Sequence, residues 1–261
     1  MTQEFVVYSK DGCPYCDKVV QLLQFAELKH VVYKLGENFT REAFYKEYGN
    51  GATFPQVTYN DKPVGLELPD KLFELWQHFK EVRFNFSIDA YGQRNNYIRY
   101  PSQWEDVAKN LKRLDENTRD NTVINIACAV QLLNAGYIDE LAEWKMDQGF
   151  SKINPSMFGG GIIGTHLVYL PSYLNVRVLP QKAKLWVKDK LETFIDRQKF
   201  NLEFNQHPYG AQRWNGLIKY MMQEDWSTKL PALREYLTVT DERRGTDYTK
   251  TFKELGELIN E

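Results

Sequence analysis

Cys13 and Cys16 are the residues of this sequence whose type and spacing most clearly predict chemistry. An apolar run at residues 5–8 predicts a strand before them, and an amphipathic run at residues 15–28 predicts a helix after them. The first sulfur is therefore expected at a helix N-terminus, where unpaired N–H groups and a partial positive charge favour a thiolate. Lys10 adds to that field. A thiol in such a place has its pKa lowered by roughly one to five units, which predicts thiol–disulfide exchange at neutral pH.

Three patterns in the sequence could suggest a metal-binding or phosphate-binding site, but each has a simpler interpretation. The Cys13–Cys16 spacing also occurs in half of a structural zinc site, but that site needs two further ligands, and the third cysteine, Cys128, has no Cys or His pair near it. His166 and His207 lie far apart with no carboxylate pattern around them, so we expect no metal site. The glycines at 159–161 lack a following Gly-Lys-Ser/Thr, so we interpret them as a loop.

Composition limits the class of protein. The 261 residues are enough for two domains, and 43% hydrophobic residues can build their cores. A net charge of −2 with dispersed lysines and arginines predicts no nucleic-acid partner. The sequence has no apolar run near 18 residues, so no membrane span is expected. Three cysteines and an N-terminus without signal-peptide features predict a reducing, cytoplasmic location.

The first 80 residues predict a compact order of elements around the cysteines. The expected strands and helices follow the order β-α-β-α-β-β-α, at residues 5–8, 15–28, 30–34, 40–48, 56–59, 62–64 and 70–80. Thr40 is expected to cap its helix, with glycines at 49–51 ending it, and Asn60-Asp61 is expected to form a hairpin turn. Cys13-Pro14-Tyr15-Cys16, with Thr53-Phe54-Pro55 downstream, resembles the glutaredoxin family, including its short phage-type members.

The glutaredoxin resemblance implies a thioredoxin fold over residues 1–80 and a set of roles. Cys13 would be the attacking thiol and Cys16 the resolving thiol, with Pro55 following a cis peptide bond. Glutathione would be the co-substrate, with no tightly bound cofactor and no metal. The residues implied to contact it are Lys10, Tyr15, Thr53, Phe54, Pro55 and Asp70. Asp70 would bind the γ-glutamyl amine, although a plain helix cap is an equal interpretation. The family's second glycine is absent at Gly65-Leu66-Glu67, where Glu67 would repel the glutamyl carboxylate.

Residues 81–261 predict a second region in which strands alternate with helices. Strands are expected at 82–89, 122–126 and 162–169, helices at 103–114, 137–146 and 182–199, and a tail helix at 248–259. The alternation predicts parallel β/α units, so the fold class is α/β: a thioredoxin-fold domain, then a partial β/α-barrel-like region with a helical tail.

The run from Ser87 to Pro101 resembles the twitch-domain radical S-adenosylmethionine proteins, over roughly residues 82–261. The sequence lacks the C-x-x-x-C-x-x-C loop that such proteins need for their iron–sulfur cluster, so radical chemistry is not expected. Ser87, Asp89 and Arg99 are then expected to pack and hydrogen-bond at strand ends.

The function predicted is that of a glutathione-linked thiol–disulfide oxidoreductase acting on disulfide-containing proteins in electron transport and cell redox homeostasis. An alternative is a redox-tethered interaction module, whose incomplete half-barrel self-associates or docks on a partner through unpaired strand edges. Two weaker alternatives remain: a fused remnant without activity, and cluster carriage by Cys13 with glutathione.

Overall fold

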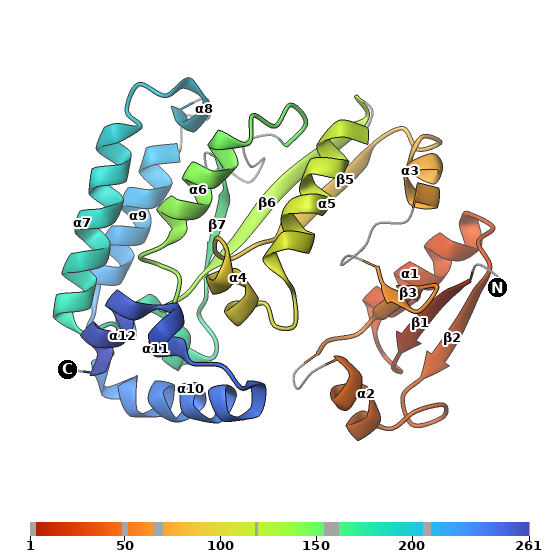
Figure 1. Ribbon diagram of the computed structural model, residues 1–261, viewed down its shortest axis with the longest axis horizontal. Helices are drawn as coiled ribbons and strands as arrows, with labels where there is room; N and C mark the ends of the chain where they lie inside the picture. Colours follow the sequence, from red (N-terminus) through yellow and green to blue (C-terminus); the bar gives the residue numbers. More distant parts are fainter. Residues whose placement is uncertain are drawn as a thin grey trace. The chain divides into compact units, whose positions relative to one another are not determined.

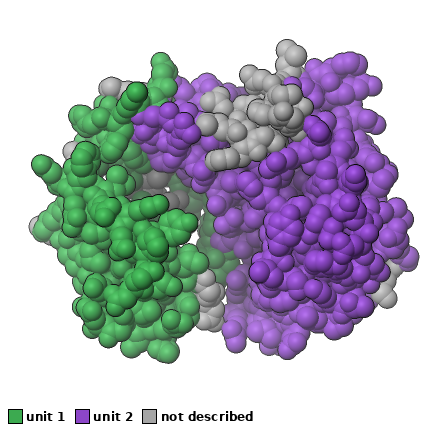
Figure 2. Space-filling view, turned by 180° about the vertical axis from the view of Figure 1, so that it is seen from behind, with its two compact units in different colours: residues 1–80, 100–121 green, residues 81–99, 122–261 purple. Residues whose placement is uncertain are grey.

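The computed structural model describes residues 4–48, 52–64, 70–117, 120–153, 162–205 and 210–260. The chain divides into two compact units (Figure 2). Unit 1 comprises residues 1–80 and 100–121, and unit 2 comprises residues 81–99 and 122–261. The segment 100–121 thus groups with the first unit, whereas the sequence placed it in the second region. The predicted domain boundary between residues 80 and 81 stays a prediction.

Unit 1 contains a mixed four-stranded sheet in the order β2-β1-β3-β4 (Figure 1). Strands β1 and β2 are parallel, and the pairs β1–β3 and β3–β4 are antiparallel. The elements of unit 1 are β1 (Phe5–Ser9), α1 (Pro14–Phe25), β2 (His30–Lys34), α2 (Arg41–Tyr48), β3 (Gln56–Tyr59), β4 (Lys62–Pro63), α3 (Asp70–Trp76) and α5 (Trp104–Asn117). The predicted thioredoxin-like order of elements is confirmed.

The two faces of β1 bury different sets of side chains, because successive residues of a strand point to opposite faces. Phe5 and Val7 are buried together with Leu23 of α1. On the other face Tyr8 contacts the aromatic rings of Phe44 and Tyr48 from α2. The sheet therefore holds α1, and with it the cysteines, through an apolar core on one face.

Local turns behaved largely as the sequence predicts. The Thr40 hydroxyl accepts the Ala43 N–H at 3.2 Å, which confirms the predicted cap of α2. Asn60 and Asp61 adopt φ of 51° and 64°, and these left-handed conformations close the hairpin between β3 and β4. The glycines at 49–51 lie outside the described residues.

Three predicted helices end earlier or are interrupted. Helix α1 ends at Phe25 rather than residue 28, because Glu27 turns to a φ of 54° and the Leu28 N–H bonds back to the Leu23 carbonyl. Helix α3 ends at Trp76 rather than residue 80, and the next residues form tighter turns. The predicted tail helix is two helices, because Phe252 leaves helical geometry with φ −121° and ψ 60°.

Unit 2 contains a parallel three-stranded sheet in the order β5-β6-β7 (Figure 1). Its strands are β5 (Val82–Ser87), β6 (Thr122–Val130) and β7 (Gly164–Leu167). Its α-helices are α4 (Gln93–Ile98), α6 (Ile138–Asp147), α7 (Gln181–Arg197), α8 (Leu202–Asn205), α9 (Gly210–Gln223), α10 (Leu230–Arg244), α11 (Tyr248–Thr251) and α12 (Lys253–Asn260), and its 3-10 helices are η1 (Ser172–Leu174), η2 (Val176–Val178) and η3 (Ser227–Lys229). The predicted parallel sheet and helical tail are confirmed, although β5 and β7 are shorter and β6 longer than expected.

The core of unit 2 is apolar and rich in aromatic residues. Val187, Leu191 and Phe194 form a buried apolar face of α7. The Phe194 and Trp214 rings stack with centroids 4.8 Å apart, so Trp214 of α9 belongs to the core. This packing fixes the helices that follow the parallel sheet.

Candidate redox site

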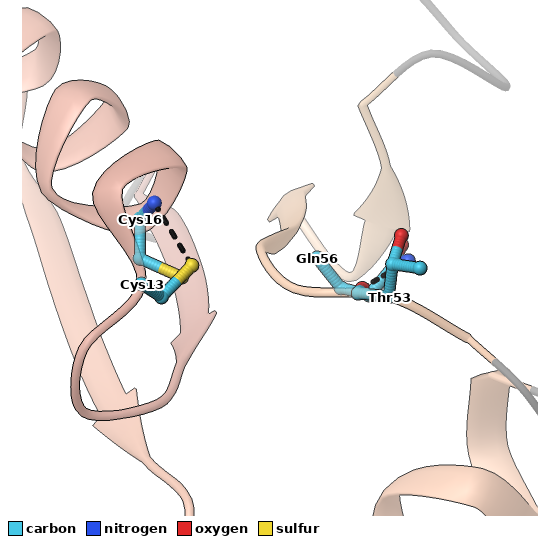
Figure 3. Close-up of a disulfide and its surroundings, with 4 residues drawn as sticks. All are labelled: Cys13, Cys16, Thr53 and Gln56. Carbon is cyan, nitrogen blue, oxygen red and sulfur yellow. Dashed lines mark hydrogen bonds between the residues drawn. A yellow bond between two sulfur atoms is a disulfide. The ribbon is translucent and has the colours of Figure 1, made fainter.

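The two cysteines lie where β1 gives way to α1. Gly12 has a φ of +67°, a conformation that glycine adopts without strain, and it turns the chain into the helix. Cys13 is the N-cap of α1, and Pro14 fills the first turn, where a missing N–H leaves no helical bond unmade. Cys13 and Cys16 form a disulfide with their Cα atoms 5.3 Å apart (Figure 3). The sequence placed both sulfurs correctly at a strand-to-helix junction.

The two sulfurs have different environments. The Cys16 N–H donates to the Cys13 Sγ at 3.2 Å (Figure 3). Cys13 is 5% exposed, whereas Cys16 is 0% exposed. A hydrogen bond to sulfur and a helix N-terminus both favour a negative charge there. Cys13 is also the less deeply buried residue of the pair.

A second loop meets this junction through the register of the sheet. Tyr8 pairs with Gln56 in the antiparallel ladder of β1 and β3, so residues 53–55 lie beside the end of β1. The Phe54–Pro55 peptide bond is cis, as the sequence predicts. The Gln56 side chain donates from Nε2 to the Thr53 carbonyl at 3.0 Å (Figure 3). Gln56, which the sequence reading did not single out, therefore orients the loop.

Lys10 and Phe54, two of the predicted contact residues, come together. The Lys10 Nζ lies 5.8 Å from the centroid of the Phe54 ring. Phe54 in turn stacks on Phe44 of α2, with centroids 4.2 Å apart. The motif gave no sign of Phe44, because it lies ten positions away in a separate helix. The Lys10 ammonium group therefore lies near the Phe54 ring, which is itself packed against Phe44.

Tyr15 and the charges around the cysteine loop complete the described site. Tyr15 is 69% exposed, and the Lys18 Nζ lies 5.7 Å from its ring centroid. Asp11 forms an ion pair with Lys34 at the end of β2, with 3.7 Å between Nζ and Oδ1. Both Asp11 and Lys34 were missed, and their pairing joins the cysteine loop to the neighbouring parallel strand.

Asp70 is the first described residue of α3, which begins where the sequence predicts a helix. Its predicted roles as a helix cap or as the partner of the γ-glutamyl amine stay predictions. Its carboxylate pairs with Arg113 of α5, and the Arg113 guanidinium lies 5.0 Å from the Phe73 ring centroid. None of the contacts described for Asp70 reaches the cysteine loop. The segment Gly65-Leu66-Glu67, where the sequence departs from the glutaredoxin pattern, lies outside the described residues.

Several other features that the sequence singled out can be located in the described part of the chain. Within the described residues, no group of three His, Cys, Asp or Glu side chains could hold a metal ion. Cys128 is buried in β6, and burial raises the pKa of its thiol. The helices described here include none with the length and apolar character needed to cross a membrane. The glycines at 159–161 and His207 are outside the described part of the chain.

The comparisons with known proteins agree with this geometry for part of the chain. Residues 5–64 match the family model of glutaredoxin. No curated protein matches the chain. The match stops before α3, so it includes neither Asp70 nor residues 82–261, whose likeness to radical S-adenosylmethionine proteins stays a prediction. The match and the Cys13–Cys16 pair together support thiol–disulfide oxidoreductase chemistry. Over residues 5–64, this chain is similar to glutaredoxin.

Proposed function

We propose that this chain is a glutathione-linked thiol–disulfide oxidoreductase in which Cys13 attacks and Cys16 resolves. One observation carries the proposal: the Cys13 sulfur caps α1, accepts the Cys16 N–H and is already bonded to the Cys16 sulfur. The helix terminus and this N–H stabilise the Cys13 thiolate, and thiolates rather than thiols attack disulfides. The proposed location is the cytoplasm, where such a dithiol is kept reduced.

Reduction of a substrate disulfide proceeds in two exchanges. The Cys13 thiolate attacks one substrate sulfur, so a Cys13–substrate bond forms, the substrate S–S bond breaks, and the released thiolate takes up a proton. The Cys16 thiol then loses its proton and attacks the Cys13 sulfur. The Cys13–Cys16 disulfide forms and the second substrate thiol leaves, so two electrons have passed to the substrate. The deeper burial of Cys16 restricts it to this internal step.

Glutathione restores the dithiol in two further exchanges. One glutathione thiolate attacks the Cys13 sulfur, which forms a Cys13–glutathione bond and releases the Cys16 thiolate to be protonated. A second glutathione attacks the glutathione sulfur, leaves as oxidised glutathione and frees the Cys13 thiolate. Lys10, Tyr15 and the backbone of residues 53–55 are the proposed contacts of glutathione, because Lys10 and Tyr15 flank Cys13 in the sequence and residues 53–55 lie beside the end of β1.

Asp70 is the proposed partner of the γ-glutamyl amine, and Arg113 competes with that amine. The two side chains already form an ion pair. Glutathione would have to displace the guanidinium before its own ammonium group could bind the carboxylate. Asp70 is 91% exposed, and exposed ion pairs contribute only about 0–1 kcal/mol, so this competition is weak.

A glutathione-coupled disulfide reduction assay tests the proposal. Wild type is expected to turn over, and Cys13→Ser to fall to the uncatalysed rate. Cys16→Ser should keep activity on a small glutathione mixed disulfide, which needs Cys13 alone, and lose activity on a protein disulfide. Equal rates for wild type and Cys13→Ser would show that Cys13 is not the nucleophile.

A second function, a docking module, is favoured by the sheet of unit 2. Within the described residues, β5 and β7 each pair with β6 alone, so each leaves one edge without a strand. Such edges can pair with a strand from another chain. We propose self-association as the form to test, using light scattering after size exclusion on the full chain at several concentrations. A constant monomer mass would contradict it.

A further inference from the structure

A cavity of about 260 Å³ opens at the carboxyl end of the parallel sheet of unit 2. Its walls come from the segment after β5, from α4, from the segment after β6, and from η1 and α10. The charged side chains in its lining are Asp89, Arg99 and Arg244, so the lining has a formal charge of +1. Ligands of open parallel sheets bind outside the carboxyl ends of the strands. The position and the charge both favour a small anion.

Arg99 is held so that part of its guanidinium stays available. Its Nε donates to Asp89 Oδ2 at 2.6 Å, and Asp89 Oδ1 accepts the Ala129 N–H of β6 at 2.7 Å. The Asp89 side chain is 4% exposed, and that of Arg99 is partly exposed. Within the described residues, the two terminal nitrogens of Arg99 have no partner. A guanidinium fixed through Nε presents its remaining N–H groups as a fork for a carboxylate or phosphate.

Two buried asparagines fix the loops that carry this arrangement. Asn95 Oδ1 accepts the Asp89 N–H at 3.1 Å, and Asn134 Nδ2 donates to the Asp89 carbonyl at 2.7 Å. Asn134 Oδ1 also accepts the Gln131 N–H at 2.7 Å. Asp89 and Gln131, which lie on different loops, are therefore tied to one side chain. Buried polar networks of this kind hold their members in one geometry.

Gln131 lines the same cavity and has a buried hydrogen-bond acceptor without a partner among the described residues. It is 8% exposed, and that acceptor is its Oε1. A buried acceptor without a partner is unfavourable, and a ligand that donates a hydrogen bond would satisfy it. The cavity volume lies below the roughly 300–1,000 Å³ of drug-sized sites, which suits a molecule of few atoms.

We propose that this cavity binds a small carboxylate that also carries a hydrogen-bond donor, of the α-hydroxy or α-amino acid class. The Arg99 fork takes the carboxylate, and the Gln131 amide takes the hydroxyl or amino group. Arg244, anchored through Nη1 to the Tyr97 carbonyl at 3.1 Å, adds positive charge to the same wall. The site is independent of the Cys13–Cys16 pair, since all of its residues belong to unit 2.

Titration calorimetry of the full chain with glycolate, acetate and phosphate tests the proposal at fixed ionic strength. Glycolate is expected to bind, and acetate, which lacks the donor, to bind about 2- to 10-fold more weakly. Arg99→Gln should weaken glycolate binding about 10-fold or more, because it removes a charged donor pair. Gln131→Met should reduce glycolate binding to the level of acetate and leave acetate unchanged.

Two controls keep the test decisive. Arg197→Gln on α7 removes the same charge from the exposed ion pair that Arg197 forms with Glu143 of α6, and glycolate affinity should not change. If Arg99→Gln does not fold, the Gln131→Met comparison of glycolate with acetate decides instead. The proposal is overturned if glycolate does not bind, if Arg99→Gln or Gln131→Met binds it like wild type, or if phosphate binds more tightly than glycolate.

Discussion

The two units differ in how their polar sites are assembled. In unit 1, Cys13 and Cys16 lie within one turn of one helix, and a disulfide and an N–H to sulfur hydrogen bond link them. In unit 2, Arg99 and Gln131 come from separate segments and reach one cavity through the buried Asp89 and Asn134. The first site depends on a helix terminus, whereas the second depends on the packing of a sheet and its loops.

Each unit contains an Asp–Arg ion pair, and the two pairs differ in how deeply the aspartate side chain is buried. The Asp70–Arg113 pair of unit 1 has an Asp side chain that is almost fully exposed, whereas the Asp89–Arg99 pair of unit 2 has an almost fully buried one. Exposed pairs contribute about 0–1 kcal/mol, while removing one member of a buried pair costs roughly 3–5 kcal/mol. We therefore expect substitutions in unit 1 to change mainly the rate of disulfide reduction, and substitutions in unit 2 to change mainly the free energy of unfolding.

The largest expected effect is on the rate of disulfide reduction, measured in two variants that each replace one cysteine, one in each unit. Cys13→Ser removes the attacking sulfur and should lower disulfide reduction by roughly 10³-fold or more. Cys128→Ala should leave that rate unchanged, because its thiol is buried in β6. Initial rates of the glutathione-coupled assay measure both. Loss of activity in Cys128→Ala with an intact fold would show that the redox chemistry is not confined to unit 1.

The second effect contrasts the two aspartates. Asp89→Ala leaves the Ala129 N–H without an acceptor and the partly exposed Arg99 without its partner, and should destabilise unit 2 by about 1–3 kcal/mol. Asp70→Ala should cost less than about 1 kcal/mol. Hydrogen exchange of the peptide covering residues 122–130 reports the first change, and that of residues 70–76 the second. Equal losses of protection would contradict the role given to burial.

Sequence reasoning succeeded where structure is decided locally. The strand His30–Lys34 and the turn at Asn60-Asp61 were predicted with their bounds, because apolar alternation and turn residues lie within a few positions. The Cys13–Cys16 junction was found in the same way. The ends of α1 and α3 were missed because backbone hydrogen bonds after Phe25 and Trp76 end those helices, and no glycine or proline marks them.

Sequence reasoning missed one helix that has a local pattern and several features that depend on distant residues. Helix α9 was not predicted, although Trp214, Leu217, Ile218 and Met221 follow helical spacing and are buried. In α10 the buried face includes Thr240, a polar residue that weakens the apolar pattern. Arg113 reaches Asp70 from 43 positions away, so no local pattern could associate them. Asp89 and Arg99 were expected to hydrogen-bond at strand ends, but the cavity around them needs α10 as a wall.

The third effect is a pH dependence that unit 2 should show. Burial raises the pKa of Cys128, so above an unfolded pKa of about 8.5 the folded chain retains a proton that the unfolded chain loses. Stability contributed by this thiol is complete below pH 8.5 and falls as the pH rises, by up to about 1.4 kcal/mol per pH unit. Urea unfolding at pH 8–9.5 of wild type and Cys128→Ala measures it. The variant should show the shallower decline, and parallel curves would contradict this.

The smallest expected effect is that of Arg113→Ala on glutathione use. The change frees the Asp70 carboxylate from its ion pair, so the KM for glutathione should fall by about 2- to 5-fold, the range of an exposed pair. The rate at saturating glutathione should not change, because Arg113 does not touch the cysteines in the contacts described for it. Lys112→Ala, which loses the exposed pair with Glu116 on the same helix, is the matched control and should leave the KM unaltered. A rise in KM for Arg113→Ala would mean that the Arg113 guanidinium binds the glutamyl carboxylate of glutathione. Helix α5 would then supply the cationic partner of that carboxylate, because Glu67 would repel it at the position that glutaredoxins usually use.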